Sequence, residues 1–401
     1  MFNSAIVICW LILFLSSAGI FMVFIGYPLL LVIRLMVKQL RGVNQHKNSD
    51  NLPTVSVITV SHKTGDLLNQ KLENVKEINY PPDRMEFIFF QDGAGNESMP
   101  DIKAQLPGIT AKQLASDLHN GKAYGLNKAV SESTGDILIF SDVDSIVNKE
   151  AFRKLVRHFT DQTIGGVCGQ RTIRSDNIRL KSAQTRYLAF DNLIKRMEGK
   201  VASLTSNEGK LYAIRRNLFK PIDPAATDDL YNCLSVVEAG YRFVFEPEAV
   251  MFIRSPSRNA KHEVDRRRRV VTRSLHGIAQ HRKLLNPTLY GWYSFSLLIN
   301  KLLRRCLPLA LIGLFASSLV LARQSLFALA LLLLQAACYC TALLYPLTKK
   351  YNPGGKWGRM IKKPISLATY FLLGNYGTLL GLTDFLKGKR VEKWTPIKSD
   401  D

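Results

Sequence analysis

Cysteine is scarce in this sequence, and so are acidic residues. The six cysteines include no Cys-x-x-Cys pair, and four of them lie within apolar runs. This usage excludes a disulfide framework and a cysteine-based zinc site, and it indicates that the soluble part faces a reducing compartment. The 401 residues contain 32 acidic against 54 basic side chains, a formal net charge of +22. We therefore expect an anionic surface or an anionic partner.

Two glycine-rich nucleotide-binding motifs are also absent. The sequence contains neither G-x-x-x-x-G-K-[ST] nor G-x-G-x-x-G, so neither a P-loop ATPase nor a dinucleotide-dependent dehydrogenase is supported. Hydrophobic residues make up 47% of the chain and charged residues 21%. This mixture excludes both a pure membrane bundle and a disordered basic tail, and it favours membrane segments joined to a soluble domain.

The N-terminal run is apolar and uncharged from Ala5 to Ile33. Because about 20 apolar residues span the hydrocarbon core, we expect a transmembrane anchor over residues 1–37. A cleaved signal peptide would carry a basic n-region, whereas no basic residue precedes Arg34. Four basic residues follow the run: Arg34, Lys38, Arg41 and Lys47. By the positive-inside rule, the domain that follows lies in the cytosol.

Further apolar runs lie near the C-terminus. Two of them, separated by only two residues, predict a transmembrane hairpin over residues 306–347, whose basic flanks both return to the cytosol. A third run, residues 364–386, also has basic residues on both sides. It either spans the membrane with the tail, residues 387–401, outside, or it is re-entrant or interfacial. Its Gly377-x-x-x-Gly381 pattern would let another helix approach closely.

A strongly basic segment precedes the hairpin, and we expect residues 256–305 to form helices at the membrane interface. From Arg258 to Arg305 there are 12 basic and 2 acidic residues. Attraction to anionic membrane lipids accounts for most of such a run. Nucleic-acid binding is the other use of a basic run, but no signature of a nucleic-acid-binding fold accompanies it. We therefore expect no nucleic-acid partner.

Between these segments, residues 52–255 carry alternating strand and helix signals. Their order predicts a cytosolic α/β domain that is Rossmann-like, with a mainly parallel sheet. Three β-branched, aromatic or apolar runs are typical of buried strands, and two segments between them have apolar residues at helical spacing. The expected strands cover residues 54–60, 85–90 and 136–140, and the expected helices cover residues 67–78 and 122–133.

Acidic residues follow two of the expected strands. Asp92 closes one of them, and Asp142 and Asp144 close another. Ligands of open α/β sheets bind beyond the carboxyl ends of the strands, and paired carboxylates there suit Mg²⁺ or Mn²⁺ completed by substrate phosphates. Lys122, at the start of an expected helix, would neutralise a departing diphosphate. The plainer alternatives are a polar turn that caps a strand and a solvated lysine.

A third acidic cluster, Thr227-Asp228-Asp229, precedes another expected helix. One interpretation is an N-cap, because Asp and Thr side chains accept hydrogen bonds from free backbone N–H groups. The other is a general base that takes the proton from an acceptor hydroxyl and must be ionised at neutral pH. We favour Asp229 as this base.

In order along the chain, these elements resemble the membrane-embedded family 2 glycosyltransferases, which include the cellulose, hyaluronan and poly-N-acetylglucosamine synthases. The resemblance rests on PTVSVITVSHKTG, YPPDRMEFIFFQDG, GKAYGLNKAVSESTGDILIFSDVDS, SNEGKLYAIRR, TDD and FLKGKRVEKW. It implies a GT-A fold. The resemblance further implies that Asp92 contacts the nucleotide, Asp142 the nucleotide sugar and Asp144 the metal. The tail resembles the family's cytosolic ending, which favours a third run that does not span.

The resemblance also implies residues on the acceptor side. Glu208 lies in the segment before the base, and Asp228 stands beside Asp229 in the position of the family's T-E-D. The processive synthases carry Q-x-x-R-W, whereas this chain aligns Arg266 and Arg269 with that motif and has Val270 in place of the tryptophan. A valine offers no aromatic platform for a sugar ring, so a transferase that adds one or a few sugars to a lipid-linked acceptor rivals a polymerase.

These expectations combine into one hypothesis. The protein would be a multi-pass enzyme of the inner or plasma membrane that transfers a sugar, with inversion, from a UDP-sugar to a growing polysaccharide or glycolipid. Its expected partners are the donor, a glycan or lipid-linked acceptor, membrane lipids, and export or polymer-processing subunits. A membrane-tethered, lipid-binding scaffold that uses the arginine run is the non-enzymatic alternative.

Overall fold

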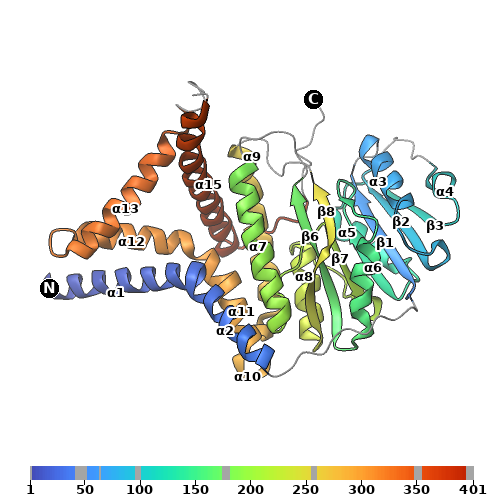
Figure 1. The fold of residues 1–401 in the computed structure, drawn as a ribbon, viewed down its shortest axis with the longest axis horizontal. Helices are drawn as coiled ribbons and strands as arrows, with labels where there is room; N and C mark the ends of the chain where they lie inside the picture. Colours follow the sequence, from blue (N-terminus) through green and yellow to red (C-terminus); the bar gives the residue numbers. More distant parts are fainter. Residues whose placement is uncertain are drawn as a thin grey trace.

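The computed structural model of the protein describes residues 2–40, 52–62, 65–94, 101–173, 181–253, 260–346 and 355–393. Three predicted features lie outside these ranges: the basic residues Arg41 and Lys47 after the anchor, Arg258 in the basic segment, and residues 394–401 of the tail. The described residues form an α/β domain from which a group of long helices extends (Figure 1).

An eight-stranded sheet forms the centre of the α/β domain, in the order β3-β2-β1-β4-β7-β6-β8-β5. Strands β3, β2, β1 and β4 are parallel, β7 is antiparallel to both β4 and β6, β8 is parallel to β6, and β5 is antiparallel to β8. The predicted mainly parallel α/β fold is therefore confirmed, and the structure adds the antiparallel pairings that make the sheet mixed. The strands are β1 (Val55–Ser61), β2 (Met85–Asp92), β3 (Thr110–Ser116), β4 (Ile137–Ser141), β5 (Ile146–Val147), β6 (Ile164–Ile173), β7 (Leu211–Arg215) and β8 (Arg242–Ile253).

The three strands expected from the sequence are β1, β2 and β4, which lie side by side in the sheet. All are almost wholly buried because helices cover both faces. Strand β3 was not expected. Its sequence, TAKQLAS, is half polar, and it stands at the edge of the sheet with only Ala111 buried. An edge strand exposes part of its surface and therefore lacks the apolar run that identifies a central strand.

Helices cover both faces of the sheet, and strand β2 shows why. Successive side chains of a strand point to opposite faces, so Phe87 and Phe89 pack with α3 (Asp66–Lys76) and α6 (Ala151–Val156) in one core. Ile88 and Phe90 pack on the other face with α5 (Lys122–Ser131) and α8 (Asp228–Glu238). Each such side chain contributes about 1.5–3 kcal/mol by burial. The expected helices at residues 67–78 and 122–133 correspond to α3 and α5.

The remaining helices are short ones between the strands of the sheet domain, and others that lie between the sheet and the long apolar helices. Helix α7 stands between the two, as Figure 1 shows. In chain order they are η2 (Pro82–Arg84), α4 (Ile102–Gln105), η3 (Arg157–Thr160), α7 (Lys181–Val201), η4 (Arg216–Leu218), α9 (Ala260–Gln280), η5 (Arg282–Leu285), α10 (Pro287–Tyr290), α11 (Trp292–Leu297) and the π-helix η6 (Leu298–Leu303).

The long apolar helices include three that are long and apolar enough to cross a membrane: Ser4–Lys38, Leu326–Leu343 and Lys363–Leu386. The first comprises most of α1 (Phe2–Phe21), η1 (Met22–Gly26) and α2 (Tyr27–Leu40). The expected hairpin forms two helices, α12 (Leu307–Leu321) and α13 (Leu326–Leu343). Helix α12 is long enough only together with Trp292–Leu303, from which it is bent by 63°. Figure 1 shows α1 and α12 side by side, extending away from the sheet.

The predicted close approach of a helix to Gly377-x-x-x-Gly381 is confirmed, and the approaching helix is α9. Both glycines lie on α15 (Gly355–Leu386). A Cβ at Gly377 would lie 2.8 Å from the carbonyl oxygen of Val264, and one at Gly381 would lie 2.6 Å from that of Arg268. The Arg268 guanidinium also pairs with Asp384 at 2.5 Å. Small residues thus let the two backbones meet, and an ion pair fixes their alignment.

The arginine run differs from the expected lipid-facing stretch, because much of it is bonded within the protein. Arg267 bonds Glu263 at 2.9 Å and the hydroxyl of Tyr370 at 3.0 Å. Arg273 donates to the carbonyl oxygens of Pro224 and Ala226 at 3.2 and 2.5 Å. The basic helix therefore connects α15 on one side to the segment before α8 on the other.

A buried carboxylate joins the first apolar helix to the sheet domain. Glu198 on α7 is 2% exposed, and it accepts hydrogen bonds from the Tyr27 hydroxyl at 2.5 Å and from the Asn300 side-chain amide at 2.9 Å. The backbone N–H of Thr205 donates to it at 3.0 Å. Because a buried charge is stable only when it is fully hydrogen-bonded, these contacts define how α2, α7 and η6 sit together.

The α9–α15 contact predicts opposite effects for two glycine substitutions in the same helix. Gly381→Ala places a methyl group against the Arg268 carbonyl, and we expect it to destabilise the protein by about 1–3 kcal/mol. A Cβ at Gly374 meets nothing within 4 Å, so Gly374→Ala serves as the control and raises helix stability by about 0.5–1 kcal/mol. Thermal unfolding in detergent measures both, and equal shifts of the two midpoints would contradict the packing.

Candidate active site

The carboxyl ends of the parallel strands bring most of the predicted site residues to one edge of the sheet. Asp92 ends β2, and Asp142 and Asp144 follow β4. Helices α5 and α8 both begin at this edge, with Lys122 and Asp228 as their first residues. Neighbouring parallel strands end together, which is why acids far apart in the sequence meet here.

Lys122 is the residue that joins two of these acids. Its Nζ lies 2.8 Å from Oδ1 of Asp142 and 2.9 Å from Oδ2 of Asp228. Burial disfavours the charged ammonium, yet the two carboxylates outweigh burial and raise the pKa of Lys122. The same contacts lower the pKa of Asp228 despite its burial. The lysine is therefore not the solvated side chain of the plainer interpretation.

A second lysine, Lys210, pairs with the other acid of the D-x-D sequence and was not predicted. It lies directly before β7, its Nζ contacts Oδ1 of Asp144, and it is 3.6 Å from Oδ2 of Asp142. The SNEGK segment in which it lies was assigned to the acceptor side on the basis of the resemblance. Only the antiparallel pairing of β7 with β4 reveals that it returns to the D-x-D turn.

The donor set at this edge suits a hard divalent cation. Asp142 and Asp144 retain 25% and 17% exposure of their side chains, and their carboxylate oxygens face two cationic lysines. Among the described residues, no three His, Cys, Asp or Glu side chains gather as a complete metal cage. A cation bound here would need further oxygen ligands, which a diphosphate supplies.

Asp92 has a different environment from the one its predicted role suggested. The residue is 2% exposed, and its carboxylate accepts hydrogen bonds from the backbone N–H groups of Asn120 and Gly121, both at 2.8 Å. Nδ1 of His119 lies 2.7 Å from the same carboxylate, and the ring of His119 packs on that of His62 at 4.5 Å. Asp92 thus holds the loop that leads into Lys122, and its contact with a nucleotide stays a prediction.

Asp229 occupies the first turn of α8, in contact with the acceptor-side segment. Burial, together with the neighbouring charge of Asp228, raises the pKa of Asp229 to about 6. A Cβ at Gly209 would lie 3.2 Å from Oδ2 of Asp229, so a larger residue there would crowd this carboxylate. Thr227 is the N-cap residue, but its hydroxyl makes no capping hydrogen bond. The helix start is therefore not explained by Thr227 capping.

The predicted acceptor-side residues fall into separate places. Glu208 is buried and pairs with Arg171 and Lys195, both at 3.3 Å. Arg266 forms an ion pair with Glu263 of its own helix, and the shortest N–O distance is 2.8 Å. Arg269 lies on the same helix, and burial and then the neighbouring arginines lower its pKa.

The arginine of α9 that reaches the candidate base was not predicted. Arg273 is 8% exposed and binds the backbone just before α8. Its charge also acts on both Asp228 and Asp229. Arg273 lies one helical turn beyond Arg269, on the same face of the helix. The i, i+4 spacing of these two arginines was therefore the feature of the sequence that could have identified it.

The segment after α15 returns to this same edge of the sheet. Arg390 pairs with Asp223 at 3.1 Å, and Nε2 of His276 lies 3.0 Å from the carbonyl oxygen of Lys389. The carbonyl oxygen of Glu392 lies 2.9 Å from where a Cβ of Gly121 would be. The C-terminal segment therefore contacts the loop that Asp92 orders.

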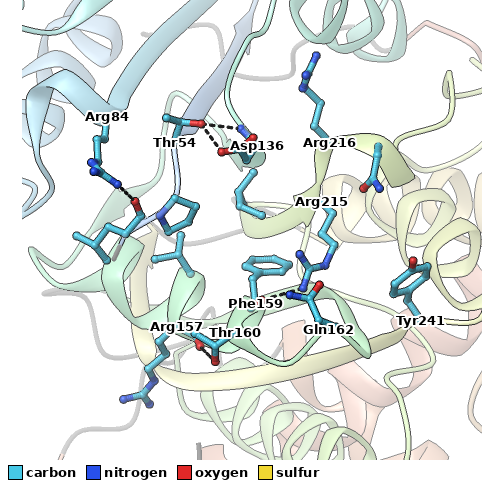
Figure 2. Close-up of a pocket in the computed structure, with 15 residues that line it drawn as sticks. Thr54, Arg84, Asp136, Arg157, Phe159, Thr160, Gln162, Arg215, Arg216 and Tyr241 are labelled. Carbon is cyan, nitrogen blue, oxygen red and sulfur yellow. Dashed lines mark hydrogen bonds between the residues drawn. The ribbon is translucent and has the colours of Figure 1, made fainter. Parts of the chain in front are cut away.

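A cavity of about 720 Å³ lies at the opposite end of the sheet, where β1 and β4 begin (Figure 2). Two of the arginines that line it are bonded to the protein. Arg215 donates to the carbonyl oxygens of Phe159 and Ile164 at 2.8 Å, and Arg157 pairs with Glu246 at 2.7 Å. Ligands of open α/β sheets bind at the other end, so the candidate site is the acidic edge.

Together, the sheet order and the structural match described below place this domain in the GT-A-like class of folds. Residues 56–222 match the model of glycosyl transferase family 2, and the chain therefore contains a family 2 glycosyltransferase domain. This match includes Asp92, Lys122 and the D-x-D turn, and it ends before Asp228 and Asp229.

Two curated relatives match about half of the chain. A probable glycosyltransferase of Bacillus subtilis, YdaM, is 26% identical over 227 residues, covering 52% of this chain and 53% of its own. A poly-beta-1,6-N-acetyl-D-glucosamine synthase of Staphylococcus aureus is 23% identical over 215 residues, covering 52% of both chains. The chain thus spans about half the length of these relatives.

A solved structure matches nearly all of the chain. The mannosyltransferase PcManGT of Pyrobaculum calidifontis, solved with GDP-Man and Mn²⁺, superposes with a TM-score of 0.66 at 21% identity. The match covers 94% of this chain and 100% of the other. The two proteins share a fold that includes the long apolar helices as well as the sheet domain.

The double ion pair of Lys122 predicts a large effect of its removal. Lys122→Met removes the closest cation of two partly buried carboxylates, and we expect a loss of about 2 kcal/mol of stability, below the 3–5 kcal/mol of a fully buried pair. Lys128→Met, at an exposed position of the same helix, is the control. Denaturant unfolding compares them, and equal stabilities would contradict a structural role of the ion pairs.

Proposed function

We propose that this protein is a membrane-bound inverting glycosyltransferase. It moves a sugar from a nucleoside-diphosphate sugar to a growing glycan or a lipid-linked acceptor. The observation that carries the proposal is the meeting of Asp142, Asp144 and Lys122 at the carboxyl edge of the sheet with Asp229 at the start of α8. This edge offers oxygen ligands for a cation, positive charge for a diphosphate and a carboxylate for an acceptor proton.

The donor side consists of the D-x-D turn and the two lysines. Asp144, with Asp142 beside it, would hold Mg²⁺ or Mn²⁺, which when bound neutralises charge on the diphosphate. Lys122 and Lys210 already lie next to these acids and would share that task as the sugar–phosphate bond breaks. We propose a UDP-sugar as donor, and GDP-mannose as the second candidate because PcManGT was solved with it.

The acceptor side centres on Asp229. With a pKa of about 6, its carboxylate is ionised at neutral pH and basic enough to accept a proton. The acceptor hydroxyl loses its proton to Asp229, its oxygen bonds to the anomeric carbon, and the bond from that carbon to the diphosphate breaks. Because the hydroxyl attacks opposite the leaving diphosphate, the anomeric configuration inverts.

The acceptor is proposed to be short or lipid-linked. Val270 stands where the processive synthases have tryptophan, and it is 40% exposed on α9. A valine cannot stack on a sugar ring as an indole does. This residue supports addition of one or a few sugars over the synthesis of a long polymer.

We propose a multi-pass protein of the inner or plasma membrane, with residues 52–255 as the cytosolic domain and residues 306–347 as the hairpin. The tail contacts the catalytic edge through Arg390 and Glu392. Both ends of α15 then lie on the cytosolic side, which supports an interfacial or re-entrant α15.

The observed contacts weaken the alternative of a lipid-binding scaffold. Arginines that would bind lipid in that alternative are bonded to the protein instead.

Donor turnover tests the enzyme directly. With detergent-purified protein and a panel of UDP-sugars and GDP-mannose, we expect release of the nucleoside diphosphate from one donor, dependent on Mn²⁺ or Mg²⁺. Asp144→Asn should reduce the rate at least about 100-fold because a charged cation ligand is lost. A full rate in Asp144→Asn would contradict the metal assignment, and the size of the product separates single addition from polymerisation.

The base assignment predicts a pH profile. A carboxyl with a pKa of about 6 is protonated below that pH, so kcat/KM should fall about tenfold per pH unit below pH 6 and level off above pH 7. Asp229→Asn should lower kcat about 10²–10⁴-fold and leave donor binding intact. Initial rates between pH 5 and 8 at fixed Mn²⁺ measure the profile. Near-normal turnover of Asp229→Asn would show that another group takes the proton.

A further inference from the structure

Helix α3 places two polar side chains directly behind the D-x-D turn. Lys71 is fully buried, and its Nζ donates hydrogen bonds to the Ser141 hydroxyl at 2.5 Å and to the Ser145 carbonyl oxygen at 2.9 Å. Asn74, one turn further along α3, binds both backbone groups of Val147 at 2.9 Å. Neither residue was singled out from the sequence.

These contacts fall on both sides of the acid pair. Ser141 is the last residue of β4, and Ser145 is the first residue after Asp144. The turn between them is closed by a backbone hydrogen bond from the N–H of Ser145 to the carbonyl oxygen of Asp142 at 3.1 Å. Lys71 therefore connects the strand before the acids to the chain after them.

A lysine is a costly choice for this position. The other buried side chains of α3 include Leu68, Leu72 and Val75, which pack in the apolar core. A fully buried ammonium loses its hydration, and burial lowers the pKa of Lys71 to about 7, although Asp142 and Asp144 oppose that effect. An apolar residue would fill the same space without this penalty, so packing alone does not explain the lysine.

We propose that Lys71, assisted by Asn74, is a positioning residue that holds the Asp142-x-Asp144 turn in the geometry that binds a divalent cation with a nucleoside diphosphate. The inference rests on the proposed function of that turn. Lys71 reaches neither the cation nor the donor. It acts through the backbone on either side of the two acids, and it limits the positions that their carboxylates adopt.

Lys71→Met tests this role, because methionine fills much of the lysine's volume but donates no hydrogen bond. Lys76→Met, at an exposed position of the same helix, is the matched control. Binding of Mn²⁺ in the presence of UDP or GDP is measured by electron paramagnetic resonance, alongside thermal unfolding and kinetics. We expect Lys71→Met to unfold at or above the control's midpoint, yet to need at least about tenfold more Mn²⁺ for half-saturation.

The kinetic readout separates positioning from a merely structural role. At saturating Mn²⁺ the turn is held by the cation itself, so kcat of Lys71→Met should stay within about threefold of the control while its apparent KM for the donor rises. Asn74→Ala breaks the second attachment and should shift Mn²⁺ half-saturation in the same direction by about threefold. If Lys71→Met does not fold, Lys71→Gln, which keeps one donor, replaces it with the same expectation.

The outcomes distinguish this proposal from the one on which it rests. If the unaltered protein neither binds Mn²⁺ with a nucleoside diphosphate nor turns over any donor, the proposed function fails. If the unaltered protein does both, and Lys71→Met and Lys76→Met share one Mn²⁺ binding curve, only the positioning role fails. A lowered unfolding midpoint with unchanged Mn²⁺ binding would likewise overturn it and leave Lys71 as a structural residue.

Discussion

The pairing of acids with lysines at one edge of the sheet is the interaction on which the rest of the structure depends. Asp142, Asp144 and Asp228 crowd together because strands and helices end there, and their mutual repulsion would be unfavourable without Lys122 and Lys210 between them. These ion pairs neutralise the edge before any substrate arrives. The same lysines are then already in place for a diphosphate, so the groups that stabilise the fold are also the groups that the proposed chemistry needs.

The surrounding helices hold this edge in place from several directions. Arg273 on α9 binds the backbone before α8, and α15 is fastened to α9 through Gly381 and the Arg268–Asp384 ion pair. The apolar helices and the acidic edge are thus parts of one packed unit. If the proposed function is correct, this connection gives a physical route by which the apolar helices orient the proposed base, Asp229, relative to the donor site.

The central fold and the chemistry-bearing acids were readable from the sequence. Strands β1, β2 and β4 are apolar runs bounded by turns, and buried strands of this kind can be recognised from the sequence. The acids at their ends were found by position rather than by motif. Lys210, His119 and Lys71 were not found, because each acts through a neighbour distant in the chain: Lys210 through the pairing of β7 with β4, His119 through the loop before α5, and Lys71 through α3. Nothing local distinguishes these side chains from solvated ones.

The sequence by itself determined the class of the fold, the apolar helices and the charged residues at the ends of the strands, because these follow from local periodicity and composition. Tertiary structure alone decided which charges meet. It placed two lysines between the acids, turned Asp92 inward to order a loop, and bonded arginines expected at the lipid surface to α15 and to the backbone before α8. The reason is physical: an ion pair or hydrogen bond depends on distances of a few ångströms, and only packing brings residues so far apart in the chain within that reach.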